Sequence, residues 1–139
     1  MIEGKLTAGQ LRRIKTALQK VPFAKLLGIE LEDVEVGAAT LALDIRTDHK
    51  QNHGVVHGGA VASLIDTAAA FAVISVLPTD ERATTVDLTI SYLRPLTKGR
   101  TKCTAKVVRA GRRLIVVSAS VVDDSGTLVA TALTTYIKV

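Results

Sequence analysis

With 139 residues, the chain has the length of a protein that buries one core of its own, and we expect a single domain over residues 1–139. Hydrophobic residues make up 47% and charged residues 22%, a composition that excludes an intrinsically disordered chain. The net charge of +5 suits an anionic small-molecule ligand, and because there is no tryptophan and only two tyrosines and two phenylalanines, we expect no nucleic-acid partner.

The first half of the chain predicts a helix, two strands and a second helix, over residues 7–21, 29–35, 41–45 and 58–77. Apolar side chains recur at helical spacing in the first helix, which Thr7 can cap and which Pro22 is expected to end. Alternating apolar residues indicate that the second strand is half-buried. The second helix is apolar and rich in alanine, and we expect Pro78 and the polar residues after it to stop it.

The second half predicts four strands, over residues 86–92, 102–109, 114–122 and 128–139. Short turns join them, which predicts hairpins and a four-stranded meander. Alternate residues of the first of these strands are expected to share one face, namely Val86, Leu88, Ile90 and Tyr92. Because a long apolar helix must be covered nearly all round, we expect an α+β fold in which an antiparallel sheet wraps around one central helix, with a short helix at the N-terminus.

The central helix carries two features that chemistry can use. Gly58 and Gly59 place main-chain N–H groups at its N-terminus, where the helix dipole favours negative charge. Asp66 is the only acidic residue of this helix, and a lone carboxylate in apolar surroundings is costly unless it is paired or used. An oxyanion site and an isolated carboxylate are the minimal equipment for ester or thioester hydrolysis. The alternative is a core polar group bonded to Ser63 or Thr67.

Gly58 and Asp66 stand eight residues apart, which corresponds to roughly 12 Å along a helix that rises about 1.5 Å per residue. A carboxylate that attacks a carbonyl must come within about 3 to 3.5 Å of it. One chain therefore cannot supply both groups to one thioester, and we expect at least a dimer in which one chain provides Gly58 and the other provides Asp66.

A family resemblance rests on four segments, which are Gly54-Val-Val-His57-Gly58-Gly59 with Asp66, Val86 to Pro95, Gly111 to Leu114 and Asp124 to Ala130. With the order of the elements, they resemble the hotdog-fold acyl-CoA thioesterases, most closely the PaaI-like, phenylacetate-pathway type. The resemblance covers residues 22–139, the expected hotdog core, and leaves residues 1–21 as the N-terminal amphipathic helix. It implies hydrolysis of an aryl- or fatty acyl-CoA to the free acid and CoA, at the interface of a homodimer or of a homotetramer built from two dimers.

The resemblance also implies five catalytic residues, which are Asp66, Gly58, Gln51, His57 and Thr85. Gly58 would supply the N–H that polarises the thioester carbonyl. Asp66 would act either as the nucleophile or as the base that activates water, and both roles stay open.

The other three residues carry less specific signals. Gln51 stands where many members have asparagine, so either Gln51 or the adjacent Asn52 would make the side-chain contact. His57 would orient that amide or the substrate, although a histidine at a helix start often only caps the helix. Thr85 would help to position water, although threonine is also ordinary in strands.

Coenzyme A brings three phosphate groups, which cations near the site entrance would bind. The substrate-binding candidates are Asn52, Gly59, Arg94, Lys98, Arg109, Arg112 and Arg113. Three of the cations fall within residues 109–113, a density that favours a phosphate role over a solvated surface. The small residues of the central helix leave space for either an aryl ring or an acyl chain.

Other features argue against further ligands. Cys103 is the single cysteine and no Cys/His cluster is present, so we expect an intracellular protein without metal or cofactor. The N-terminus lacks a signal-peptide pattern and residues 58–77 contain a carboxylate, so we expect a cytoplasmic protein with no membrane partner. Two other functions stay as alternatives: a non-catalytic acyl-CoA or lipid-binding hotdog protein, and an acyl-thioester hydratase or dehydratase.

Overall fold

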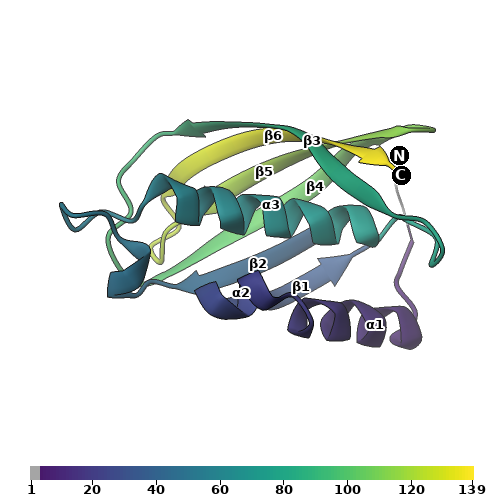
Figure 1. The fold of residues 1–139 in the computed structure, drawn as a ribbon, viewed down its shortest axis with the longest axis horizontal. Coiled ribbons are helices and arrows are strands. Elements are labelled where there is room, and N and C mark those ends of the chain that lie inside the picture. The colour runs from purple at the N-terminus through teal and green to yellow at the C-terminus, as the bar shows by residue number, and fades with distance from the viewer. Residues whose placement is uncertain (1–3) are drawn as a thin grey trace.

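The computed structural model describes residues 4–139, and its strands form one antiparallel sheet in the order β1-β2-β4-β5-β6-β3. In chain order the elements are α1 (Ala8–Gln19), α2 (Pro22–Leu27), β1 (Ile29–Glu35), β2 (Ala38–Asp44), η1 (Thr47–His49), α3 (Gly58–Ile74), β3 (Ala83–Tyr92), β4 (Arg100–Ala110), β5 (Leu114–Val122) and β6 (Leu128–Lys138). Figure 1 shows α3 lying along one face of this sheet, with α1 and α2 beside the β1 edge.

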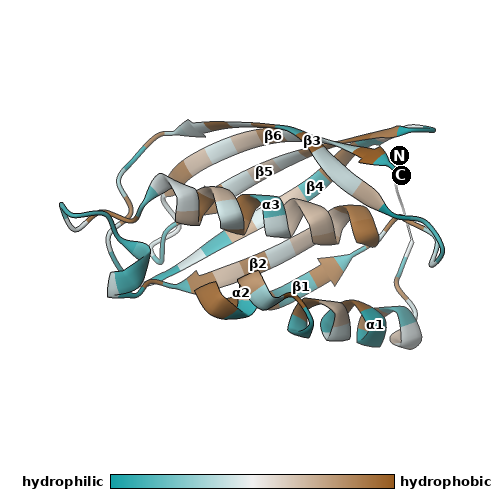
Figure 2. Cartoon of the chain, in the orientation of Figure 1, coloured by the Kyte–Doolittle hydropathy of each residue, from teal (hydrophilic) through white to brown (hydrophobic). Residues whose placement is uncertain are grey.

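The sheet encloses α3 because most of this helix is apolar: in Figure 2 it is mostly pale to brown, with a teal stretch near its middle. Its buried residues are Val61, Leu64, Ile65, Ala68, Ala69, Phe71, Ala72 and Val73. The small alanines let the helix lie close to β2, β4 and β5, whose inward residues alternate with outward ones. The predicted α+β hotdog arrangement, a sheet wrapped around one central helix, is confirmed.

The N-terminal helix begins as predicted but is followed by a second one. Thr7 caps α1: its Oγ1 accepts the N–H of Gln10, whose side chain accepts the N–H of Thr7 in return. Pro22, which was expected only to end this helix, begins α2, because a residue without an N–H suits the first turn of a helix. Ile14 and Leu18 of α1 are buried, so this segment packs onto the core.

α3 ends at Ile74, three residues earlier than predicted. The Oγ of Ser75 donates to the carbonyl of Ala72 and accepts the N–H of Gly37, which ties the end of the helix to the β1–β2 turn. Across residues 4–139, none of the helices combines the length and the apolar character that crossing a bilayer requires.

β3 departs from the predicted meander in two ways. Of the four strands of that meander, only β4, β5 and β6 are neighbours in sequence order, and β3 lies at the outer edge beside β6. The register shifts between Thr85 and Asp87, which is a β-bulge. The extra residue leaves Val86 58% exposed, whereas Leu88 and Ile90 pack against the core. The prediction that Val86 shares their face is therefore wrong.

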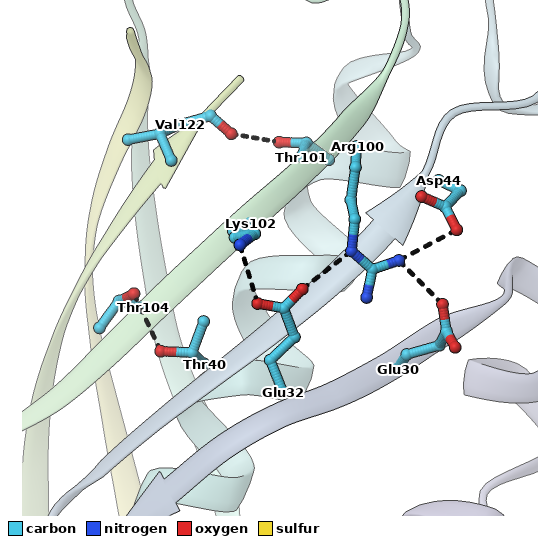
Figure 3. A network of polar contacts seen from close by, with 9 residues as sticks. All are labelled: Glu30, Glu32, Thr40, Asp44, Arg100, Thr101, Lys102, Thr104 and Val122. Carbon is cyan, nitrogen blue, oxygen red and sulfur yellow. Dashed lines mark hydrogen bonds and ion pairs between the residues drawn. The ribbon is translucent and has the colours of Figure 1, made fainter. Parts of the chain in front are cut away.

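On the face turned away from α3, charged side chains join β1, β2 and β4 (Figure 3). The guanidinium of Arg100 lies 2.8 to 3.0 Å from three carboxylates, those of Glu32, Glu30 and Asp44. Lys102 lies 3.0 Å from Glu32. The hydrogen bond from Arg100 holds the pKa of Glu32 below its ordinary value. These contacts attach the edge strand β1 to β4 across β2.

Candidate active site

Asp66 lies near the middle of α3, half-buried, with two hydroxyl groups on one carboxylate oxygen. Its Oδ1 accepts hydrogen bonds from Oγ1 of Thr85 at 2.9 Å and from the hydroxyl of Tyr136 at 2.7 Å. The same hydroxyl lies 2.8 Å from the main-chain carbonyl of Asp66. Ser63 and Thr67 do not bind this carboxylate, because their hydroxyls donate to main-chain carbonyls one turn earlier in α3.

The β-bulge explains how β3 brings Thr85 to α3. Under strict alternation, Thr85 and Leu88 would face opposite sides of the sheet, because their positions differ by an odd number. The extra residue at Val86 reverses the alternation, so that both face α3. The cross-strand partner of Thr85 is Tyr136 on β6, which places the two hydroxyls next to each other.

Tyr136 was not singled out by the sequence pattern. Only 3% of its surface is exposed, and burial raises the pKa of its hydroxyl well above the ordinary value, with the carboxylate of Asp66 adding to the rise. The group therefore stays protonated at neutral pH and acts as a donor. One signal was available: it is one of two tyrosines in the chain, and it lies in the predicted last strand.

Asp66 opens onto a cleft of about 310 Å³. Its polar lining consists of Asp66, Thr67, Thr84, Thr85 and Tyr136, and its apolar lining of Ala17, Val21, Ala70, Phe71, Ile74 and Ala83. The N-terminal helix thus supplies one wall. A second cleft of about 240 Å³ shares Ala70, Ile74, Ala83 and Tyr136 with the first, so the apolar space continues toward the C-terminal end of α3.

The N-terminus of α3 leaves one main-chain donor unused. His57 is the N-cap, and its Nδ1 accepts the N–H of Gly59 at 2.8 Å while its carbonyl accepts the N–H of Ala60 at 2.9 Å. Within residues 4–139, no group accepts the N–H of Gly58, which lies at the positive end of the helix dipole. Tyr92 donates to the carbonyl of Gly58 at 2.8 Å and so fixes this first turn.

Gly58 lines a cleft of about 340 Å³ between the start of α3 and the loop after β3. No residue lines both this cleft and the cleft at Asp66. Within one protomer, the free N–H and the carboxylate therefore belong to separate clefts.

The predicted amide donors lie in the loop before α3. The side-chain carbonyl of Gln51 accepts the N–H of His53, so the NH₂ group is the part of this amide left to donate. Asn52 is exposed beside it. In the part of the chain that the structure describes, no three His, Cys, Asp or Glu side chains gather as a metal site requires.

The five cationic candidates fall into two groups, and all five are exposed. Arg94 lines the cleft at Gly58 and bonds through its N–H to Val129 at the start of β6, and Lys98 follows in the same loop. The other three lie in residues 109–113, around the β4–β5 turn, where the carbonyl of Arg113 accepts the N–H of Lys138 at the end of β6. The two groups therefore lie at opposite ends of β6.

Both the matching family model and a curated relative of this chain are thioesterases. A family model described as Thioesterase superfamily matches residues 53–130, which include the last part of the loop before α3, all of α3 and the start of β6. The chain is 30% identical to the medium/long-chain acyl-CoA thioesterase YigI of Salmonella typhimurium over 84% of each chain.

Two solved structures are similar along nearly the whole chain. The PaaI protein of the phenylacetic acid degradation operon of Escherichia coli superposes with a TM-score of 0.87 at 26% identity, covering 94% of this chain and 93% of that one. A thioesterase family protein from Silicibacter pomeroyi superposes with a TM-score of 0.89 at 25% identity, covering 94% and 98%.

Proposed function

The chain belongs to the thioesterase superfamily, and from this premise we propose that it hydrolyses acyl-CoA thioesters to the free acid and CoA. The observation that carries the proposal is the carboxylate of Asp66, which two hydroxyls hold at the mouth of an apolar cleft. A charged group kept in such surroundings by dedicated donors is typical of a catalytic site.

In the proposed reaction, the N–H of Gly58 donates to the carbonyl oxygen of the thioester and stabilises the negative charge that develops there. Asp66 either attacks the carbonyl carbon directly or removes a proton from the attacking water. If water attacks, the C–S bond then breaks and the oxygen of water remains in the free acid. If Asp66 attacks, loss of the sulfur leaves a mixed anhydride between the acyl group and Asp66, which water then hydrolyses to the free acid and the carboxylate. In both cases the sulfur of CoA leaves and takes up a proton that water supplies. His57 contributes by capping α3, which keeps the neighbouring N–H groups in place.

The proposed site lies between two protomers, because the two groups line separate clefts of one chain. Gly58 of one protomer would act with Asp66 of the partner subunit, and two-fold symmetry would give two such sites in each dimer. A homotetramer of two dimers would keep the same sites.

The apolar cleft beyond Asp66 would receive the acyl group, with Ala70 and Ala83 leaving room for an alkyl chain or an aryl ring. A relative named as a medium/long-chain acyl-CoA thioesterase supports the former, and the similarity to PaaI, from a phenylacetic acid operon, supports the latter. Arg94 and Lys98 at the cleft of Gly58 would bind phosphates of CoA.

The test is release of free CoA thiol from a panel of straight-chain and aryl acyl-CoA thioesters. Asp66→Ala should lower kcat/KM by about 100-fold or more. Asp80→Ala removes an exposed carboxylate from the loop after α3 and lines neither cleft, so it should keep the wild-type rate. A wild-type protein that is inert across the panel, or an active Asp66→Ala, would overturn the proposal, and tight binding without turnover would identify a non-catalytic acyl-CoA-binding protein.

A further inference from the structure

The two carboxylate oxygens of Asp66 have different surroundings. Oδ1 accepts from both Thr85 and Tyr136, whereas Oδ2 has no hydrogen-bond partner within residues 4–139. Asp66 itself lines the apolar cleft. The two hydroxyls therefore distinguish two oxygens that a free carboxylate would exchange by rotating about its terminal bond.

Resting on the proposed function, we propose that Tyr136 is a positioning residue that holds Asp66 so that Oδ2 is the oxygen that reacts with the thioester or with water. Its hydroxyl lies 2.7 Å from Oδ1 and 2.8 Å from the main-chain oxygen of the same residue, so it fixes the side chain relative to the backbone of α3. The ring is buried between α3 and β6, which fixes the donor in turn.

This assignment changes the role of Thr85. Its hydroxyl has one hydrogen, and that hydrogen is given to Oδ1 at 2.9 Å. Toward an attacking water, the hydroxyl of Thr85 can then only accept a hydrogen bond. Its main role is therefore to hold the carboxylate of Asp66, and any contact with the water is secondary. Tyr136 is a hydrogen-bond donor to the carboxylate, because burial raises the pKa of its hydroxyl and keeps it protonated.

Tyr136→Phe removes the hydroxyl and keeps the buried ring, and Thr134→Val is its matched control. Thr134 is 1% exposed on the same strand, and its hydroxyl donates to the carbonyl of Asp87 on β3 at 2.7 Å, away from Asp66. Both variants lose one buried hydroxyl between β6 and a neighbouring element. We expect similar falls in melting temperature for the two, which separates loss of stability from loss of positioning.

The activity readout is the division of the effect between kcat and KM. Tyr136→Phe should lower kcat by about 10- to 100-fold with KM nearly unchanged, because the reacting oxygen is misplaced while the acyl cleft is intact. Thr134→Val should keep the wild-type kcat and KM. A folded Tyr136→Phe with wild-type kcat would overturn the proposal.

A second readout does not depend on turnover. Carboxyl ¹³C NMR of labelled aspartate at neutral pH reports the surroundings of the Asp66 carboxylate, with its signal assigned by its loss in Asp66→Asn. Its chemical shift should move in Tyr136→Phe and in Thr85→Val, because each variant removes a donor to Oδ1, and should stay in place in Thr134→Val. An inert wild-type protein would defeat the proposed function alone, whereas an unchanged chemical shift in Tyr136→Phe would defeat the positioning role whatever the activity.

Discussion

The substitution Gly58→Pro removes the main-chain N–H that α3 leaves without an acceptor, and it should leave the helix itself intact. Gly58 is the first residue of α3, a position that proline favours because it needs no N–H there. His57 before it has φ −61° and ψ 133°, in the extended region that a residue before proline adopts. A Cβ on Gly58 would lie 3.3 Å from the ring of Tyr92, a tight contact that this ring can relieve because it is 54% exposed.

Loss of one oxyanion donor costs about 100- to 1,000-fold in kcat, or roughly 3 to 4 kcal/mol of transition-state stabilisation. Gly58→Ala is the matched control, because it places the same Cβ against Tyr92 and keeps the N–H. The assay is thiol release at saturating acyl-CoA, with circular dichroism to show that both variants fold. The alanine variant should keep most of the activity and the proline variant should lose it. A folded Gly58→Pro with kcat within about threefold of Gly58→Ala would refute the oxyanion argument.

Three further predictions follow from the fold and the proposed dimer. Refolding Gly58→Pro and Asp66→Ala chains together should restore about a quarter of the wild-type activity. Half of randomly assorted dimers are mixed, and each mixed dimer has one intact site of two. If native mass spectrometry detects mixed dimers but no activity returns, a shared site is excluded. Arg100→Gln should lower the free energy of unfolding by about 1 kcal/mol near neutral pH. The hydrogen bond from Arg100 lowers the folded-state pKa of Glu32, which contributes stability at pH values above the ordinary pKa of this group. That contribution is lost as the pH falls through the lowered pKa, so urea unfolding should show the difference between the two proteins shrinking as the solution is made acidic. Ile65→Ala, at a fully buried position, should cost about 2 to 5 kcal/mol in the same assay, and a loss below about 1 kcal/mol would contradict the enclosure of α3.

The fold could be predicted because its main signals are local. Helical spacing, strand alternation and turn residues each act over a few positions, and they predict the helix–strand order that the structure shows, apart from the short helices α2 and η1. The position of β3 at the edge of the sheet was not predicted, because pairing with β6 depends on contacts between residues far apart in the chain. The start of α2 at Pro22 was missed because proline both ends one helix and suits the first turn of the next.

The bulge in β3 left a trace in the sequence that was not used. An inward face shared by Val86 and Leu88 excludes an inward Thr85, since side chains alternate along a regular strand. Yet Thr85 was also expected at the site. The two expectations conflict, and Thr85 can face inward together with Leu88 only if an extra residue lies between them. The structure has that residue at Val86, which faces outward.

Short-range sequence patterns could not predict that Tyr136 contacts Asp66. Its contact with Asp66 joins positions 70 residues apart and depends on the register of β6 against β3. No spacing rule within one segment reveals such a pair. What the sequence does reveal is the cost of burying Asp66 without donors, and that cost predicts that hydroxyl or amide partners must come from elsewhere in the chain.

The proposed shared site also constrains how two protomers meet. If Gly58 of each protomer acts with Asp66 of the partner subunit, a two-fold axis relates the two Gly58–Asp66 pairs, so the two α3 helices run antiparallel beside each other. The axis then passes nearest the midpoint of positions 58 and 66, which is Ala62, a small residue that is only partly buried within the protomer. A large side chain there would hold the two helices apart and separate both pairs at once. In such a dimer, the small residues of α3 allow two close contacts. Some of them let the sheet lie close to α3, and Ala62 lets α3 of the partner subunit lie close to it.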